Sequence, residues 1–511
     1  MNGSRTKNTI LNLFANVGGQ IVSILLRFIS RTIFIYVLGK SYLGINGLFS
    51  NILEVLSLAE LGVGTAIIYN MYEPLAHKDY HRLAALTNYY KILYRKIAVV
   101  VFVIGMAILP FLDKIINLDQ DIPHIYLFYI LSVLNTTVSY LYVYKTSILS
   151  ADQKEYKLKI YRTVFQFIQI IAQTIILFIF KSYLLYMIVQ IVCSISSNIW
   201  TAHKATELYP EVNRNIQIQL SKQEKKNIWS NIKAMFSYKI GGIMMNNTSQ
   251  ILISALVSTE MVGLYSNYLM VTQSLTSITS MLFTSVKASI GNLATEKNHQ
   301  KEYEVFRVLD LMAFWVYGGG TIGLIILLND FIRIWVGNSY VLMYTTVIII
   351  AFSFYIAGII YPITCYRETI GLFKQTKNIL LYSSAINLLL SIILGQIWGL
   401  NGILLATIIA RICTNFWYEP YKLYSLYFKV PFSKYIITHI KDAIIIILLV
   451  ILGINTIGKI NSGSIILDLA IKFVIAFIAI NIVFVIYKNK EIKYIGDYIK
   501  GILKVFHIKS K

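Results

Sequence analysis

The chain has little charge and little cysteine. Only 14% of its 511 residues are charged, whereas 57% are hydrophobic; soluble proteins carry about 25% charged residues. Nearly uncharged runs recur from end to end, and about 20 apolar residues span a bilayer. Strands of alternating polarity with Gly/Asn turns, typical of outer-membrane barrels, do not occur in the sequence. The composition therefore predicts an all-α polytopic membrane protein.

The sequence also lacks the motifs of enzymes and metal sites. It contains no Walker loop, no G-x-S-x-G, no H-E-x-x-H and no C-x-x-C, so no catalytic residue, cofactor or metal is predicted. Cys193, Cys365 and Cys413 lie in apolar runs and form neither a disulfide framework nor a zinc pattern. The predicted outer loops are short, which disfavours a membrane-bound sugar polymerase, since such an enzyme needs a large outer loop.

Fourteen candidate spans account for the apolar runs. They lie at about 9–38, 43–70, 97–118, 123–147, 161–181, 183–203, 235–257, 261–286, 308–329, 341–364, 378–398, 400–419, 442–459 and 464–487. With both termini cytoplasmic, the outer loops hold only five of the 46 Lys and Arg residues, as the positive-inside rule requires. The net charge of +22 therefore reflects topology and attraction to anionic membrane lipids, and does not indicate nucleic-acid binding.

A weak internal repeat suggests two lobes. "YLGINGLFSNIL" (42–53) resembles "MVGLYSNYLMVT" (261–272), and "EPLAHKD" (73–79) resembles "GNLATEK" (291–297). Six predicted spans separate the copies, so both copies cross the membrane in the same direction, as in transporters with parallel repeats. We expect two pseudo-symmetric six-helix lobes followed by two extra transmembrane helices and a basic amphipathic tail. The expected bounds are 1–222, 223–430 and 431–511.

Two arginines interrupt the first span. Arg27 and Arg31 lie four residues apart in "SILLRFISRTIF" (23–34), so they share a helix face. An arginine at the centre of a span costs about 2.5–3.5 kcal/mol, and intramembrane charges mark pathways or partners. The pair is therefore expected either to line a cavity that binds an anion or to hold helices together.

The second span supplies acids. Arg27 and Glu54 lie at similar depths on antiparallel neighbours, which predicts an ion pair and leaves Arg31 for a mobile anion. Asn51 matches the depth of Arg31 in the same way. Glu60 is not on the face of Glu54, since six residues turn a helix by about 240°, and is expected to face another helix.

Other intramembrane features remain open between function and structure. Arg411 has no evident acid partner and lies at the depth of Asn387, and Lys239 lies barely one turn inside its span. Lys472 follows Asp468 by four residues, which favours an ion pair within one helix. The glycines at 318–320 suggest either a hinge or close helix packing.

The opening of the chain resembles a known family. "LRFISRTIFIYVLGKSYLGINGLFSNILEVLSLAELGVGTAIIYNMYEPLA" is similar to the start of bacterial Wzx-type polysaccharide flippases, with an arginine in the first helix, "LG" and an aromatic at the turn, and an acid before "LG-G" in the second. These proteins belong to the multidrug/oligosaccharidyl-lipid/polysaccharide exporter superfamily. The specific similarity covers about residues 20–80, and the number of spans extends it to most of the chain.

The resemblance implies a function and a site. It implies alternating access in the bacterial cytoplasmic membrane and transport of an undecaprenyl-pyrophosphate-linked oligosaccharide to the outer leaflet for capsule, exopolysaccharide or O-antigen synthesis. Polysaccharide polymerases and glycosyltransferases are the implied partners. Arg27 and Arg31 fall where such proteins have cavity cations, and the two extra helices hold lipid at a groove in some relatives. Export of cationic drugs, or of another lipid-linked precursor such as lipid II or teichoic acid, is the alternative within the superfamily.

Overall fold

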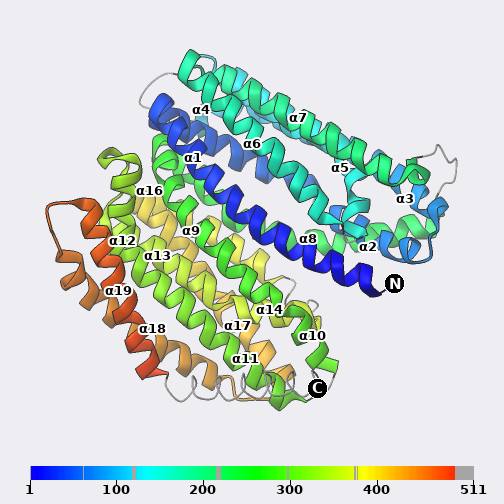
Figure 1. Cartoon of the computed structure of the whole chain (residues 1–511). Coiled ribbons are helices and arrows are strands. Elements are labelled where there is room, and N and C mark those ends of the chain that lie inside the picture. Colours follow the sequence, from blue (N-terminus) through cyan, green and yellow to red (C-terminus); the bar gives the residue numbers. More distant parts are fainter. Residues whose placement is uncertain are drawn as a thin grey trace. The chain divides into compact units, whose positions relative to one another are not determined.

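The computed structural model describes residues 2–60, 63–117, 122–152, 154–213, 220–295, 298–372, 376 and 378–488. These described residues form helices, short connections and no strand (Figure 1). The prediction of an all-α polytopic membrane protein is therefore confirmed. The expected amphipathic tail beyond residue 488 lies outside the described residues, as does part of the second span at 61–62.

The chain packs as two compact units, Met1–Ser266 and Asn267–Lys511. The helices of the first unit are α1 (Asn2–Leu56), α2 (Val63–Ala76), α3 (Tyr80–Ile108), α4 (Leu112–Ile115), α5 (Ile125–Ala151), α6 (Glu155–Phe180), α7 (Tyr183–Leu208) and α8 (Lys222–Leu256). In its core α6 packs along α1, whereas α3 and α7 pack along α5. Helix α9 (Thr259–Ser285) begins in this unit and ends in the other. The expected lobe boundary at 222/223 stays a prediction.

The second unit has its core around two central helices. Its helices are α10 (Lys287–Thr295), α11 (His299–Ala313), α12 (Gly319–Val336), α13 (Tyr344–Ile359), α14 (Tyr361–Ile370), α16 (Ile379–Cys413), α17 (Asn415–Lys422), α18 (Ser433–Asn455) and α19 (Ile465–Tyr487). Helix α12 packs against α13, α18 and α19, and α13 also packs against α16. The π-helical turn η4 (Phe314–Gly318) joins α11 to α12. A second π-helical turn, η6 (Leu423–Phe428), follows α17.

Ten helical segments of the described chain are long and apolar enough to cross a membrane. Two of these segments each contain two predicted spans, joined at the kinks at Gly39 (φ 79°) and Gly399 (φ 55°). Positive φ angles of this kind favour glycine, because it has no Cβ. Helices α8 and α9 cover the two remaining predicted spans, but they are rich in Ser, Thr and Asn. Helical segments therefore cover all fourteen predicted spans.

The glycines at 318–320 pack closely against neighbouring helices. A Cβ added to Gly318 would lie 3.0 Å from Ile446 Cδ1, and one added to Gly320 would lie 3.0 Å from Phe354 Cε1. The π-helical turn that ends at Gly318 is a feature often found at functional sites. Close packing is therefore confirmed, and the hinge stays a prediction.

The predicted ion pair between Asp468 and Lys472 is wrong. Lys472 Nζ lies 2.7 Å from Asp330 Oδ2 on the neighbouring helix α12. Asp468 instead accepts a hydrogen bond of 2.6 Å from the Ser462 backbone N–H, in the connection before α19. Spacing along one helix could not predict this outcome, because Asp330 comes from a different helix.

Candidate functional site

The two arginines of α1 have different surroundings. Arg31 is half-buried, and its guanidinium donates a hydrogen bond to Ser266 Oγ on α9. Arg27 is exposed, and its Nε donates to the Ser23 carbonyl of its own helix over 3.2 Å. The contact with Ser266 joins α1 to α9.

The predicted ion pair between Arg27 and Glu54 is wrong. No such pair exists among the described ion pairs, and both side chains are exposed. The prediction compared only depths in the membrane. It did not include the rotation of each helix segment about its axis, which decides whether two side chains at one depth point toward each other.

Asn51 and Glu60 both contact other helices of the first unit. Asn51 is buried and donates to Gln250 Oε1 on α8 over 2.9 Å, so it joins α1 to α8. Glu60 accepts a hydrogen bond of 2.9 Å from the Tyr94 hydroxyl on α3. The expectation that Glu60 faces another helix is therefore confirmed.

Glu60 also lines a polar pocket beside Arg27. The pocket has a volume of about 270 Å³, and its charged lining residues are Glu60, Glu155, Lys159 and Arg162. Ser23, whose carbonyl accepts the hydrogen bond from Arg27, lines the same pocket. The lining thus contains two acids and two bases, and Arg27 lies one turn along α1 from Ser23.

The two copies of the internal repeat meet at the kink of α1. Ser41 Oγ donates over 2.8 Å to Glu260 Oε1, a residue 219 positions further along the chain. Gly44 and Gly263 have the same spacing, and a Cβ added to Gly263 would lie 2.9 Å from Gly44 N. Equivalent positions of the two copies therefore face each other with no room for side chains. The charge distribution predicts that this end of the helices is extracellular.

Further polar contacts close the same end. Lys40 Nζ lies 2.6 Å from Glu260 Oε2. Asn117, which follows α4, donates its backbone N–H to Thr259 Oγ1 over 2.9 Å. Ser254 is fully buried and donates to the Ile115 carbonyl over 2.8 Å. We call this group of contacts between α1, α4, α8 and α9 the outer closure.

The outer closure is expected to be insensitive to pH near neutrality. Burial opposes ionisation of Glu260, but hydrogen bonds from Lys40 and Ser41 outweigh it and lower the pKa of Glu260 below its ordinary value of 4.5. A lowered carboxyl pKa stabilises the closure above 4.5, and this contribution is lost as the pH falls through the lowered pKa. A cysteine in place of the buried Ser254 should therefore stay protected from an impermeant maleimide between pH 5.5 and 8, whereas Glu260→Gln should increase its labelling. Labelling that rises between pH 8 and 5.5 would contradict this prediction.

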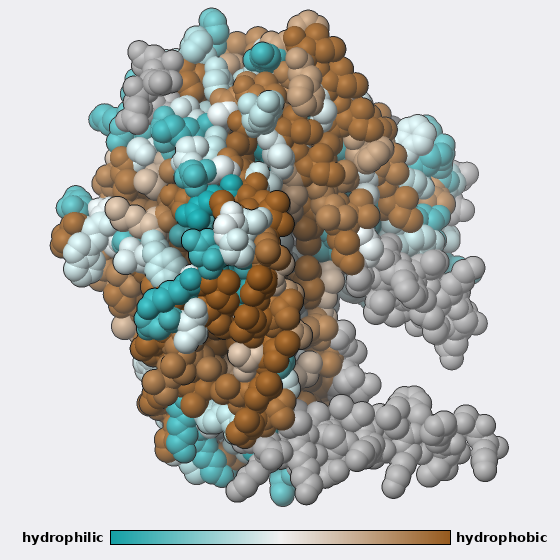
Figure 2. Space-filling view, turned by 60° about the vertical axis from the view of Figure 1, so that its left-hand side comes forward, coloured by the Kyte–Doolittle hydropathy of each residue, from teal (hydrophilic) through white to brown (hydrophobic). Residues whose placement is uncertain are grey.

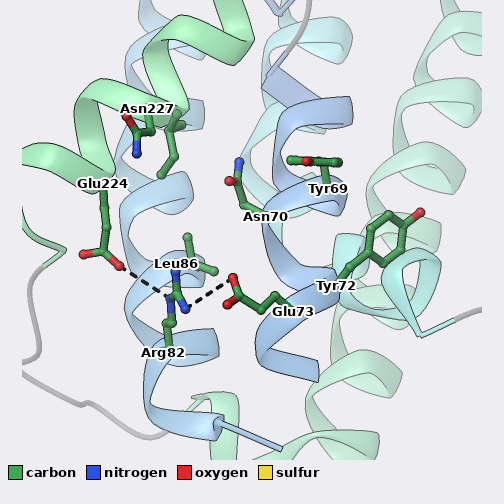
Figure 3. Close-up of a pocket in the computed structure, with 9 residues that line it drawn as sticks. Tyr69, Asn70, Tyr72, Glu73, Arg82, Leu86, Glu224 and Asn227 are labelled. Atoms are coloured by element: carbon green, nitrogen blue, oxygen red, sulfur yellow. Dashed lines mark ion pairs between the residues drawn. The ribbon is translucent and has the colours of Figure 1, made fainter. Parts of the chain in front are cut away.

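A second pocket lies at the opposite, predicted cytoplasmic end of the first unit (Figure 3). Its volume is about 270 Å³, and α2, α3 and α8 contribute Tyr69, Asn70, Tyr72, Glu73, Arg82, Leu86, Glu224, Asn227 and Ile228. Arg82 lies 3.5 Å from both Glu73 and Glu224 and so bridges α2 and α8. The capping-box contacts of Glu224 with Ser221 lower the pKa of Glu224. The pocket thus combines aromatic rings with carboxylates and amides.

The second unit has an apolar groove on α12 and α19. Its volume is about 790 Å³, and the described lining residues are Val271, Leu275, Trp315, Val316, Gly319, Gly320, Gly323, Leu324, Leu327, Leu328, Phe331, Ile466, Leu469, Ala470, Phe473, Ala476, Phe477, Ile480 and Asn481. Apolar side chains cover large areas of the face drawn in Figure 2. Gly319, Gly320 and Gly323 on α12 contribute no side chains that would fill the groove. A long hydrocarbon chain would suit it.

Arg411 and Lys239 are not placed in a common site. Arg411 is half-buried in the second unit and donates over 3.3 Å to the Ser353 carbonyl on α13. Its predicted depth neighbour Asn387 accepts hydrogen bonds from Ser391 and Thr407 over 3.2 Å each. The side chain of Lys239 lies outside the described residues. A role for either cation in binding stays a prediction.

Sequence reasoning missed the outer closure, the bridge at Arg82 and the groove. The repeat carried a signal for the first, because its 219-residue spacing relates Ser41 to Glu260. Arg82 lies in a loop region where basic residues were explained by topology alone. The sequence could not predict the groove, because its lining residues are as apolar as those of any lipid-facing helix.

No known family model matches the chain, and no curated protein matches it in sequence. Solved structures match its fold. The inward-closed lipid II flippase MurJ matches with a TM-score of 0.62 at 13% identity, over 95% of this chain and 100% of MurJ. An inward-facing multidrug resistance MATE family transporter of the MOP superfamily matches with a TM-score of 0.61 at 11% identity, over 81% of this chain and 98% of the transporter. A Vibrio cholerae MATE transporter in a bent form gives 0.54 at 13% identity, over 83% and 98%. The chain thus has the fold of these solved structures.

Proposed function

We propose that this protein is a flippase for undecaprenyl-pyrophosphate-linked oligosaccharides. It moves them from the inner to the outer leaflet of the bacterial cytoplasmic membrane by alternating access, for capsule, exopolysaccharide or O-antigen synthesis. The observation that carries the proposal is the half-buried Arg31 on a membrane-spanning helix, with Arg27, Lys159 and Arg162 in the same unit. The fold shared with a lipid II flippase supports it.

A pyrophosphate group would explain why cations lie inside the membrane. It carries at least two negative charges, and charge pairing is stronger at low dielectric than in water. The guanidinium group binds phosphate oxygens in a bidentate manner, which a lysine ammonium cannot do. In this proposal Arg31 binds the pyrophosphate, and Arg27 stabilises it from one turn away. Arg411 and Lys239 are proposed as further pyrophosphate-binding cations. Glu54, Glu60 and Asn51 are proposed as supporting or coupling residues.

The groove on α12 and α19 gives the lipid part of the substrate a place. Its lining is almost entirely apolar. The polar groups are Asn481 and the Trp315 indole N–H, and this N–H donates to Asn481 Oδ1 over 2.9 Å. In this proposal the apolar groove of the second unit binds a polyprenyl chain.

The pocket around Arg82 would suit part of the sugar. Carboxylates and amides such as Glu73, Glu224 and Asn70 accept or donate hydrogen bonds to hydroxyls, and Tyr69 and Tyr72 add exposed aromatic rings. The pocket lies at the predicted cytoplasmic end, where the substrate enters. Ligand sites of this kind combine apolar walls with a few polar groups.

Export of cationic drugs is the second candidate within the superfamily, because MATE transporters share the fold. A cation-binding cavity would require an excess of acids. In the pocket lined by Ser23, however, the bases Lys159 and Arg162 match the acids Glu60 and Glu155, so its lining has no excess of acids. Another lipid-linked precursor, such as lipid II or a teichoic acid unit, fits the same charges.

The test is translocation in proteoliposomes. The purified protein should move a fluorescent undecaprenyl-pyrophosphate disaccharide across the bilayer, and Gly323→Trp should slow this movement, since nothing lies within 4 Å of a Cβ at Gly323 and the new ring would fill the groove. Gly242→Ala, also without neighbours within 4 Å, serves as the control. Transport of a cationic dye without transport of the lipid would overturn the proposal.

A further inference from the structure

The pocket lined by Ser23 in the first unit is polar, although it lies among membrane-spanning helices. Its volume is about 270 Å³, and the only described lining residues without a polar side-chain group are Gly64, Ile68, Val143 and Leu158. Five lining residues carry aliphatic hydroxyls, namely Ser23, Thr146, Ser147, Ser150 and Thr163. Polar groups inside a membrane are expensive and tend to mark functional sites. The lining therefore indicates a hydrophilic ligand.

The charged groups of this pocket come from two sides. Glu60 ends the 3-10 turn η1 (Ser57–Glu60) before α2 and accepts a 2.9 Å hydrogen bond from Tyr94 on α3. Glu155, Lys159 and Arg162 lie on successive turns of α6. Carboxylates only accept hydrogen bonds, whereas lysine and arginine only donate them. The pocket thus offers strong acceptors and strong donors in equal number.

The polar face of α6 continues with three glutamines, of which one lines the pocket. Gln169 Nε2 donates over 3.3 Å to Gln173 Oε1, and Gln173 Nε2 donates over 3.2 Å to the Tyr186 carbonyl on α7. These two glutamines therefore hold helices together. Gln166 lines the pocket, and its Oε1 accepts a hydrogen bond of 3.2 Å from Ser23 Oγ on α1. Its amide adds a group that both donates and accepts.

The chemistry of the lining selects among ligand classes. A cation or an anion gains no net attraction, because two acids match two bases. The described residues contain no group of three or more His, Cys, Asp or Glu side chains that could hold a metal ion. A sugar fits, since each of its hydroxyls both donates and accepts hydrogen bonds. Pockets for whole drug-sized ligands measure about 300–1,000 Å³, so this pocket suits a single sugar ring.

We propose that this pocket binds one sugar residue of the carried oligosaccharide and that Gln166 helps to determine which sugar is accepted. The inference rests on the proposed function and adds a second sugar subsite to the pocket around Arg82. Helix α2 contributes Ile68 to the one pocket and the next residue, Tyr69, to the other. Consecutive residues of a helix project about 100° apart, so the two pockets lie on different sides of α2. A site built to hydrogen-bond a hydroxyl rejects analogues that lack it.

The test measures protection of a cysteine in the pocket and needs no transport. Ser150→Cys places a half-buried thiol in the lining after the three native cysteines are replaced. The rate of maleimide labelling is measured in detergent with the methyl glycosides of glucose, galactose, N-acetylglucosamine and glucuronic acid. At least one glycoside should slow the labelling severalfold. Lys222→Cys, exposed at the start of α8 and outside both pockets, should react equally fast with and without it.

Matched substitutions on α6 assign the protection to Gln166. Gln166→Leu should lose the protection, whereas Gln169→Leu, one turn along and outside the lining, should keep it. Thr163→Val keeps the shape of the side chain and removes one hydroxyl, so it should weaken the protection even if Gln166→Leu does not fold. Unchanged protection in both Gln166→Leu and Thr163→Val would overturn the proposal.

The remaining outcomes separate this inference from the proposed function. No protection by any glycoside would overturn the sugar subsite, even if the undecaprenyl-pyrophosphate disaccharide is translocated in proteoliposomes. Protection by sodium pyrophosphate but by no glycoside would show an anion site instead. Protection by a glycoside without translocation of the lipid would support the sugar subsite and overturn the proposed function.

Discussion

Replacing Arg31 by alanine is expected to slow transport strongly while the protein stays folded in the membrane. Arg31 is half-buried on α1, and its described contact is a neutral hydroxyl, that of Ser266. Arg31 is only half-buried, so the fold should tolerate the change. A hydrogen bond to a charged group contributes about 1.5–3 kcal/mol, and 1.4 kcal/mol is about tenfold. We therefore expect a loss of roughly 10- to 100-fold in the rate of pyrophosphate-lipid translocation.

Conservative and control variants separate charge from packing. Arg31→Lys keeps the charge but loses the bidentate geometry, so it should retain part of the rate. Arg95→Ala removes an exposed arginine from α3 and should transport normally. The measurement is the initial rate in proteoliposomes, normalised to inserted protein. Full transport by Arg31→Ala would remove Arg31 from the pyrophosphate site, and so would equal losses in Arg31→Ala and Arg95→Ala.

The helical architecture could be predicted because hydropathy and charge act locally. An apolar run must form a helix in lipid to satisfy its own backbone, and basic loops fix which end is cytoplasmic. The kinks at Gly39 and Gly399 had no such local signal, since glycine both bends helices and packs them closely. The sequence predicted where helices lie and left open how adjacent spans join.

Partners of buried charges could not be predicted from spacing. Arg27 was matched to Glu54 by depth and Lys472 to Asp468 by helical spacing, yet Arg27 contacts its own backbone and Lys472 contacts Asp330. Each partner depends on the rotation and neighbours of a helix, which hydropathy does not encode. The pairing of Asp310 with His439 has the same origin, because the two residues belong to helices far apart in the sequence.

Gly44→Ala is expected to abolish the outer closure. A Cβ on Gly44 would lie 2.1 Å from the Thr259 carbonyl oxygen and 2.8 Å from its carbon, and both are backbone atoms that cannot swing away as a side chain would. Within a helix alanine is otherwise favoured over glycine by about 1 kcal/mol, so α1 itself should fold. Helices α1 and α9 must then separate at this end, and a flippase that cannot close it cannot alternate. We expect translocation to fall to background with normal amounts of inserted protein.

The labelling of Ser254→Cys reports this separation directly. Ser254 is fully buried in the outer closure, so a cysteine there should react with an impermeant maleimide much faster in Gly44→Ala than in the otherwise unchanged protein. In the described part of the chain, no atom outside the backbone of α8 lies within 4 Å of a carbon added at Gly242. Gly242→Ala should therefore leave both labelling and transport unchanged. Glu260→Gln, which loses only charge, should lie between the two. If Gly44→Ala transports normally with its cysteine still protected, this glycine contact does not form part of the transport cycle.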